Sequence, residues 1–283
     1  MHVARHGTGL AAATRALASQ IHPVFMLPPI AASWFGAVLA IDLDPTLAGL
    51  HMLAAFFALY TAHVKDGYVD FYVRGEDDDH PLSAPGAKLA LALSSIGFFA
   101  CLIIIGLTVD FWAALLTLPG WLIGFLHAPQ LDMHPVTATM GYPLGISFAL
   151  LGGYYVQTQT LTLPVVAFAV VFLVILSGIK IIDDAKDYDY DRSISKRSAV
   201  VVLGKERSRR VAYALMALGL GAVLAFSLFG VFPLSATLAV AGFGVVALIA
   251  RHATPKLATM LLIRGSYVFL ALLLVAVWFR PLG

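Results

Sequence analysis

The chain has 283 residues, of which 60% are hydrophobic and only 12% are charged. Soluble proteins carry roughly twice that share of charged residues, so the composition excludes an ordinary soluble domain and predicts a membrane protein. The net charge of +2 is too small to indicate nucleic-acid binding, and a single cysteine, Cys101, excludes an intramolecular disulfide framework and a cysteine metal cluster.

The predicted elements begin with a short helix in the membrane interface. Residues 1–20 contain Arg5 and Arg15 and are too polar and too often interrupted by Gly for a signal peptide. From His22 onward, apolar runs recur, and each crossing of about 30 Å of hydrocarbon needs roughly 20 residues. The sequence therefore predicts one all-α domain over residues 1–283 with nine membrane spans, at about 23–42, 46–66, 88–108, 111–127, 139–157, 162–183, 208–229, 233–250 and 257–279.

The basic residues predict the orientation of these spans. With nine spans, the first residues and the loops after spans 2, 4, 6 and 8 share one side of the membrane. Nearly all Lys and Arg residues outside the spans fall on that side, whereas the opposite side has only Arg280. By the positive-inside rule, the basic side is cytoplasmic, and we expect the protein in the cell membrane with its functional loops facing the cytoplasm.

Two acidic segments lie on this predicted cytoplasmic side. The segment after span 2 reads KDGYVDFYVRGEDDD and places Asp66 and Asp70 four residues apart. The segment after span 6 reads DDAKDYDYD and repeats the same spacing twice, at Asp183, Asp187 and Asp191. On an α-helix, residues four apart lie on one face about 6 Å apart along the axis, so each segment is predicted to present a row of carboxylates.

These carboxylates indicate a metal and a phosphorylated substrate. Like charges four residues apart destabilise a helix, and carboxylates at a membrane boundary are costly, so the five groups need cations. Oxygen ligands suit Mg²⁺, which typically binds a few carboxylates together with substrate phosphates. Basic side chains that can contact diphosphate oxygens follow the second segment, at Lys196, Arg197, Lys205 and Arg207.

The two segments resemble the acidic motifs of the UbiA superfamily of intramembrane prenyltransferases, usually written NxxxDxxxD and DxxxDxxxD. The strongest similarity is DYDRSISKRSAVVVLG, from Asp189 to Gly204. In the first motif Asp66 replaces the family's Asn, Asp70 matches the middle Asp, and Arg74 stands where a third Asp is common. The stretch LLGGYYVQTQ, which ends at Gln159, is similar to the branch that prenylates 1,4-dihydroxy-2-naphthoate.

The resemblance implies a helical bundle around a central cavity and Mg²⁺-dependent transfer of a prenyl group from an allylic polyprenyl diphosphate to a lipophilic acceptor. Quinone or isoprenoid-lipid biosynthesis is the implied setting, and neither nucleic acid nor an obligate protein partner is implied. The implied metal ligands are Asp66, Asp70, Asp183, Asp187 and Asp191. The implied diphosphate-binding residues are Arg74, Lys180, Lys186, Lys196 and Arg197. The implied pocket residues are Tyr68, Tyr154 and Tyr155, with His127 as candidate acceptor base.

Departures from the family pattern leave alternatives open. The first span begins with His22-Pro23 where Arg-Pro is common, and the fourth lacks the Tyr and Lys usual around Ala128-Pro129, so Lys180 is expected to act as a substitute cation. One alternative is a CDP-alcohol phosphotransferase, although Tyr-Val-Asp follows Asp66-Gly67 where that class has an Ala-Arg element. The other is a non-catalytic or transport protein with the same fold.

Overall fold

The structure is a computed structural model that describes residues 2–282. The regular structure of this range is helical, and strand-like pairing is limited to one bridge between Ala4 and Leu82. Eight helices are long and apolar enough to cross a membrane, and a ninth crossing requires the pair α1 (Gly9–Ala18) and α2 (Pro23–Val38), which is bent by 65°. The predicted all-α, multi-pass membrane fold is confirmed.

The chain forms two compact units, and the first comprises Met1–Leu131 and Phe148–Gln159. Its core is apolar and small-residue rich, with Phe98, Cys101 and Ile105 packed against Ala54 and Ala58. Besides α1 and α2, it contains α3 (Pro45–Tyr68), η1 (Val69–Arg74), α4 (Ala84–Thr108), α5 (Phe111–Leu126), η2 (His127–Leu131) and the second half of α6 (Pro135–Thr158).

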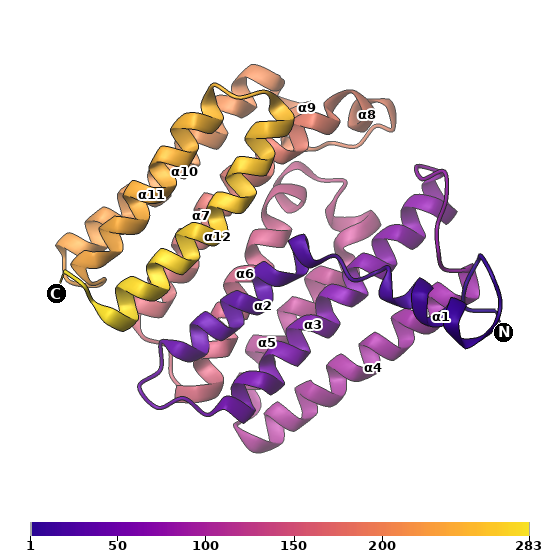
Figure 1. Cartoon of the computed structure of the whole chain (residues 1–283), viewed down its shortest axis with the longest axis horizontal. Helices are drawn as coiled ribbons and strands as arrows, with labels where there is room; N and C mark the ends of the chain where they lie inside the picture. The colour runs from indigo at the N-terminus through magenta and orange to yellow at the C-terminus, as the bar shows by residue number, and fades with distance from the viewer. Residues whose placement is uncertain (1, 283) are drawn as a thin grey trace. The chain divides into compact units, whose positions relative to one another are not determined.

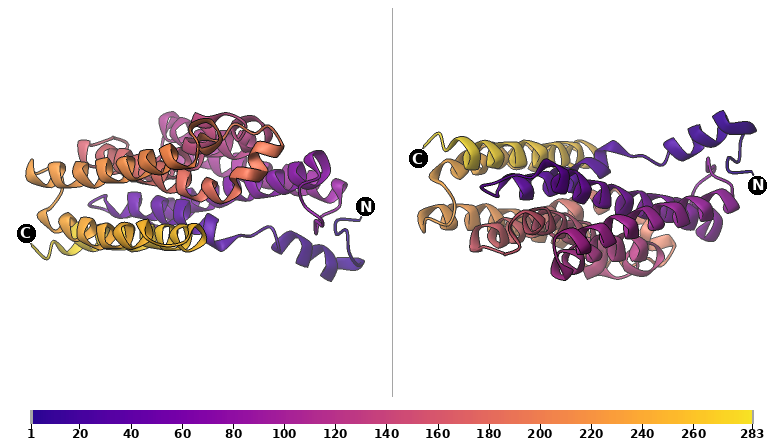
Figure 2. Two further views of the ribbon diagram at one scale, coloured as in Figure 1. Left: turned by 90° about the horizontal axis from the view of Figure 1, so that it is seen from above. Right: turned by 90° about the horizontal axis from the view of Figure 1, so that it is seen from below.

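The second unit comprises Asp132–Ser147 and Thr160–Gly283. Its most buried long helix is α7, which approaches α10 so closely that a Cβ atom at Gly178 would lie 2.6 Å from the carbonyl oxygen of Ala212. Helices α11 and α12 run side by side (Figures 1 and 2). The elements are α7 (Leu163–Asp184), η3 (Ala185–Asp187), α8 (Tyr188–Ser193), α9 (Ala199–Leu203), α10 (Lys205–Leu228), η4 (Leu234–Ala236), α11 (Thr237–Arg251) and α12 (Pro255–Phe279).

Small residues allow close helix contacts inside the first unit. A Cβ atom at Gly36 in α2 would lie 2.0 Å from the carbonyl oxygen of Leu150 in α6, and one at Gly153 would lie 2.1 Å from that of Ser33. Such contacts exclude any larger residue and are typical of membrane helix pairs. They keep α2, which has only 16 residues, tightly packed although it is shorter than a full span.

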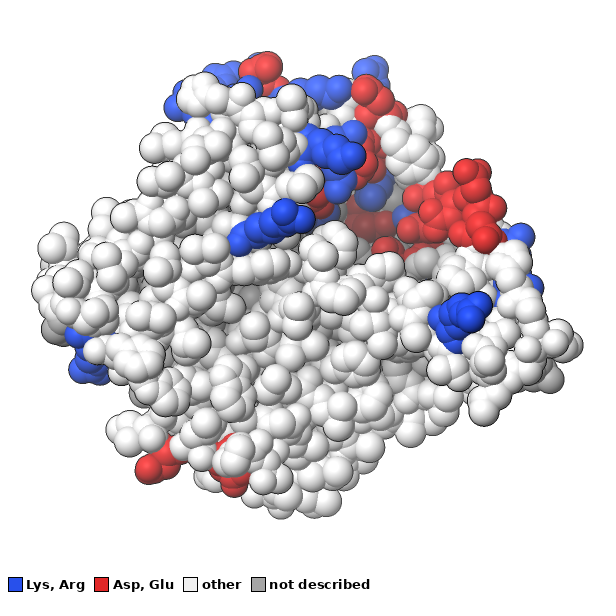
Figure 3. Space-filling view, viewed as in Figure 1, with Lys and Arg blue, Asp and Glu red and all other residues white. Residues whose placement is uncertain are grey.

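The outer surface is suited to a bilayer. Figure 3 shows that most of the surface in that view carries none of Lys, Arg, Asp and Glu. Large apolar side chains are exposed along the spans, among them Leu107, Leu218 and Val268. An exposed apolar surface of this extent marks contact with lipid rather than with water.

Candidate functional site

The first acidic segment lies where α3 ends and a π-helix begins. Asp66 belongs to α3, whereas Asp70 lies in η1, which starts at Val69. The helix is therefore not a regular α-helix over both carboxylates, but four residues make close to one turn in either kind of helix, and Asp66 and Asp70 interact electrostatically. Single π-helical turns are frequent at functional sites, where they redirect side chains.

Both carboxylates of this segment already have cationic or polar neighbours. Asp66 Oδ1 lies 4.0 Å from His127 Nε2. Asp70 Oδ1 accepts a hydrogen bond of 3.3 Å from Arg74, whose Nε also lies 3.8 Å from Glu76 Oε1. Arg74, which was expected to bind diphosphate, thus pairs with two acids of its own segment. To bind diphosphate, Arg74 would have to leave these acids.

The second acidic segment is helical throughout, but it is not one regular α-helix. α7 ends at Asp184, a 3₁₀ turn covers Ala185–Asp187, and α8 follows. Asp183, Asp187 and Asp191 therefore lie in three consecutive elements, so the predicted row does not follow one regular α-helix, although Asp187 interacts electrostatically with both other carboxylates. Repulsion between carboxylates four residues apart disfavours continuation of the helix, and 3₁₀ bonds commonly tighten a last helical turn.

Lysine side chains pair with most acids of this segment. Lys186 Nζ lies 2.6 Å from Asp183 Oδ1, and Lys196 Nζ lies 3.4 Å from the buried Asp191. Lys180 contacts Asp184 and lies 3.7 Å from Asp183 Oδ2. Asp184 was not among the predicted site residues, although its four-residue spacing from Lys180 is the signal of a helical ion pair.

Asp187 and Arg197 are predicted site residues of this segment that face solvent, as Lys186 also does. Both are exposed, and neither has an ion pair within 4 Å in the part of the chain that the structure describes. Asp187 faces a mixed electrostatic environment, since Lys186, Asp183 and Asp191 all interact with it. Its carboxylate is accordingly available to a ligand without loss of an existing ion pair.

The chemistry of these residues fits a hard divalent cation. Among residues 2–282, no three His, Cys, Asp or Glu side chains lie close enough together to hold a metal ion. The donors are nevertheless carboxylate oxygens at the ends of membrane spans, and the side chain of Asp66 is 40% exposed. Mg²⁺ accepts such oxygen ligands and retains several waters. Binding at Asp70, Asp183 or Asp191 requires their Arg or Lys partners to move.

A group of histidines lies beside the first acidic segment and was not predicted as a group. The ring centroids of His22 and His63 are 4.8 Å apart, and His63 also interacts electrostatically with His127. His127, the candidate acceptor base, thus interacts with His63 of this pair and also lies near Asp66. The sequence signal was the three-residue spacing of His63 and Asp66 on α3.

The tyrosines predicted to line the pocket lie in different places. The ring of Tyr68 is 5.2 Å from that of Tyr72, next to the first acidic segment, and Tyr154 is buried. Tyr155 donates a hydrogen bond of 3.2 Å to Asp110. Asp110, the partner of Tyr155, caps the start of α5, whereas His127, the neighbour of Asp66, follows the end of α5. Because α5 has 16 residues, its two ends lie about 24 Å apart. The structure therefore places Tyr155 far from Asp66.

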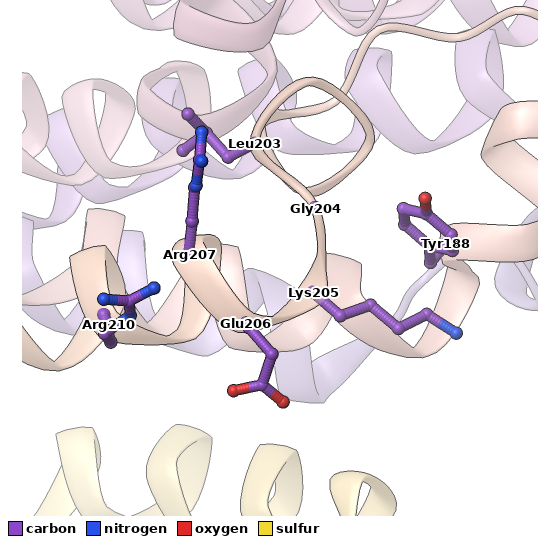
Figure 4. Close-up of a pocket in the computed structure, with 7 residues that line it drawn as sticks. All are labelled: Tyr188, Leu203, Gly204, Lys205, Glu206, Arg207 and Arg210. Carbon is purple, nitrogen blue, oxygen red and sulfur yellow. The ribbon is translucent and has the colours of Figure 1, made fainter.

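An open pocket of about 530 Å³ lies beside the second acidic segment. Three cations, Lys205, Arg207 and Arg210, line it together with Tyr188 (Figure 4). Lys205 lies over the Tyr188 ring, 4.6 Å from its centroid, and pairs with Asp189 at 3.2 Å. Of the basic residues that follow the second segment, Lys205 is thus engaged by an acid of that segment.

One family model matches most of the chain. The model of the UbiA prenyltransferase family matches residues 80–273, a range that includes the second acidic segment and begins after Asp70. No curated protein sequence matches the chain.

Solved structures share the fold. An apo UbiA homologue from Aeropyrum pernix K1 has a TM-score of 0.73 at 17% identity, with 90% of this chain and 97% of that chain covered. A UbiA homologue from Archaeoglobus fulgidus bound to DMAPP and Mg²⁺ has a TM-score of 0.65 at 16% identity, with 93% and 98% covered. A digeranylgeranylglyceryl phosphate synthase has a TM-score of 0.69 at 16% identity, with 89% and 92% covered.

Proposed function

Because the chain belongs to the UbiA prenyltransferase family and is a prenyltransferase, we propose that it transfers a polyprenyl group from an allylic diphosphate to a lipophilic acceptor and releases pyrophosphate. The observation that carries this proposal is the second acidic segment, which lies with its basic loop inside the family match. The match also favours prenyl transfer over the alternative of a CDP-alcohol phosphotransferase. We treat residues 1–283 as one catalytic domain with α1 at the membrane interface.

The proposed metal is Mg²⁺. The A. fulgidus homologue is bound to DMAPP and this ion, and carboxylate oxygens such as those of the two acidic segments are ligands that Mg²⁺ prefers. When bound, Mg²⁺ neutralises the pyrophosphate leaving group and so favours ionisation of the allylic carbon–oxygen bond. The proposed ligands are Asp66, Asp70, Asp183, Asp187 and Asp191.

The cations now paired with these carboxylates are the proposed diphosphate ligands. A carboxylate that held the metal would no longer pair with its Lys or Arg partner, and that cation could then donate hydrogen bonds to phosphate oxygens, which are stronger than bonds between neutral groups. Apolar side chains exclude water from the allylic cation, and Tyr68 is placed to contribute an aromatic ring. His127 is proposed to accept the acceptor's proton at Nε2. The released cations are Arg74, Lys180, Lys186 and Lys196, and Arg197 joins them from the surface.

We further propose that the acceptor is a precursor of a lipophilic quinone or of an isoprenoid lipid. The stretch from Leu150 to Gln159, which is similar to the naphthoate-prenylating branch, supports the quinone class. The test is to supply purified protein with geranylgeranyl diphosphate, Mg²⁺ and a panel of aromatic and glycerol-phosphate acceptors, and to identify products by mass spectrometry. A prenylated aromatic product is expected. Prenylation of glycerol phosphate alone would refute the quinone class.

Removing two basic side chains after the second segment is expected to weaken substrate binding. Charge-assisted contacts to phosphate contribute roughly 1.5–3 kcal/mol each, so Lys196→Ala with Arg197→Ala should raise the KM for the prenyl diphosphate at least about tenfold. The Mg²⁺ dependence should change far less. Steady-state kinetics measure both, with Lys88→Ala as a control at an exposed lysine of α4. An unchanged KM in the double variant would exclude the loop from diphosphate binding.

Both acidic segments are proposed to face the cytoplasm, as the charge distribution predicts. With Cys101 replaced, single cysteines at the exposed positions Asp78 and Ser195 should react with a membrane-impermeant thiol reagent only in inverted membrane vesicles. A cysteine at Arg280 should react only from the opposite side. Labelling of position 78 or 195 in intact cells would contradict the proposed orientation.

A further inference from the structure

Residues 2–6, here called the strap, pair with the loop that follows the first acidic segment. The Arg5 amide donates a hydrogen bond of 2.8 Å to the carbonyl oxygen of Pro81, and the Ser83 amide donates one of 3.0 Å to that of Val3. Ala4 and Leu82 form an antiparallel bridge between these bonds. Figure 1 shows the first residues of the chain beside the start of α4.

Side chains of the strap reinforce this pairing at Asp79. Arg5 lies 3.0 Å from Asp79 Oδ1, and His6 Nε2 lies 2.8 Å from the same oxygen. The hydrogen bond from His6 holds the pKa of Asp79 below its usual value, so this carboxylate is ionised at neutral pH. The strap is therefore held to the loop by backbone and charged contacts together.

The strap also reaches the acidic segment itself. The guanidinium of Arg5 lies 4.3 Å from the ring centroid of Phe71, the residue after Asp70. Phe71 is in turn stacked on His80, at 5.9 Å between ring centroids. The π-helix η1 thus contacts the strap directly, through Phe71 and Arg5. Through Phe71 and His80 it also contacts the loop with which the strap pairs.

His80 also packs against the residue that follows Asp66. Its side chain is buried, and its Cε1 would lie 2.7 Å from a Cβ atom at Gly67, the residue after Asp66. Burial lowers the pKa of His80, which favours the neutral ring. Tyr72 adds a hydrogen bond of 2.9 Å from its hydroxyl to the carbonyl oxygen of Leu82.

We propose that the strap positions Asp66 and Asp70, with Arg5 as a positioning residue and His80 as the group that transmits the contact. The chain of contacts runs from the strap through His80 to the two residues that directly follow the carboxylates. Metal sites lose roughly 10–100-fold in affinity when groups that orient their ligands are removed. The functional part of this inference rests on the proposed prenyl transfer, whereas the structural part does not.

A substitution outside the acidic segment can release the strap. A Cβ atom at Gly86, in the first turn of α4, would lie 2.1 Å from the carbonyl oxygen of Val3. Gly86→Ala therefore displaces the strap, while alanine itself is favourable in a helix. Gly49→Ala is the matched control, because Gly49 lies in α3 of the same unit and none of the described atoms is within 4 Å of its Cβ position.

Two measurements test the proposal on the full-length protein. Hydrogen exchange of residues 66–74 should be faster in Gly86→Ala than in wild type and unchanged in Gly49→Ala. The Mg²⁺ concentration for half-maximal prenyl transfer should rise about tenfold in Gly86→Ala only. Equal exchange and equal Mg²⁺ dependence in the two variants would overturn the proposal. Absence of prenyl transfer in wild type would refute the proposed function, and the exchange comparison would still decide whether the strap orders the segment.

Substitutions of Arg5 provide an independent test, because a general loss of stability would not explain the results expected from them. Arg5→Ala removes both the ion pair with Asp79 and the cation over Phe71, so it should raise the Mg²⁺ requirement in the same direction as Gly86→Ala. Arg5→Lys keeps a cation at this position and should restore most of the wild-type Mg²⁺ dependence. Identical Mg²⁺ requirements in Arg5→Ala and wild type would exclude Arg5 as a positioning residue.

Discussion

Replacing Asp187 by Asn is expected to abolish prenyl transfer while the protein still accumulates in the membrane. Asn keeps the volume of the side chain and removes one charge and one strong metal ligand. Asp187 is exposed and has no ion pair within 4 Å in the described part of the chain, so folding should not depend on its charge. Loss of several kcal/mol of stabilisation of the leaving group corresponds to a rate about a thousandfold lower.

The matched control for this variant is Asp189→Asn, two residues away. The side chain of Asp189 is 87% exposed and, among residues 2–282, its ion pair is with Lys205 on the surface, an interaction worth roughly 0–1 kcal/mol. Single-turnover formation of prenylated product in detergent measures both variants at saturating Mg²⁺. Comparable rates for the two would exclude Asp187 from the metal site.

Replacing Lys180 by Met is expected to destabilise the protein strongly. Lys180 pairs with Asp183 and Asp184 at the end of α7, and Asp184 is buried, with Oδ2 lacking a hydrogen-bond partner among the described residues. Removing one partner of a buried ion pair leaves an uncompensated charge and costs about 3–5 kcal/mol. Thermal unfolding of the purified variant should show a markedly lower midpoint.

A second substitution separates this structural role of Lys180 from diphosphate binding. Adding Asp184→Asn to Lys180→Met removes the uncompensated charge and should recover most of the thermal stability. If Lys180 also binds diphosphate, the recovered double variant will still have a raised KM for the prenyl diphosphate. A double variant with wild-type KM would restrict Lys180 to the ion pair, and an unchanged unfolding midpoint in Lys180→Met alone would refute the structural role.

The sequence predicted the fold class and the positions of the acidic segments well. Apolar runs of about 20 residues have few structural alternatives, because backbone groups in lipid must be satisfied within helices. The ends of the apolar runs predicted the place of the acids at span ends. The four-residue spacing of the acids did not predict that the α-helix gives way to a π-helix at Val69 and to a 3₁₀ turn after Asp184, because the spacing does not specify the backbone hydrogen-bond pattern.

Contacts between residues far apart in the sequence could not be predicted from spacing or hydropathy. Arg5 and Asp79 are 74 residues apart, and nothing in the spacing of either residue indicates their ion pair. The pairing of His22 with His63 likewise depends on how α2 packs against α3. Helical ion pairs such as Lys180 with Asp184 are different, because their four-residue spacing is visible in the sequence.

The most direct test of the central claim is pyrophosphate release from geranylgeranyl diphosphate as a function of free Mg²⁺, measured on the purified protein with an acceptor panel. We predict release coupled to prenylated product in the presence of Mg²⁺, its loss on chelation, and its recovery when Mg²⁺ is added back. Release that persists at full rate after chelation, or the absence of any prenylated product with every acceptor at saturating Mg²⁺, would contradict the proposal of a Mg²⁺-dependent prenyltransferase.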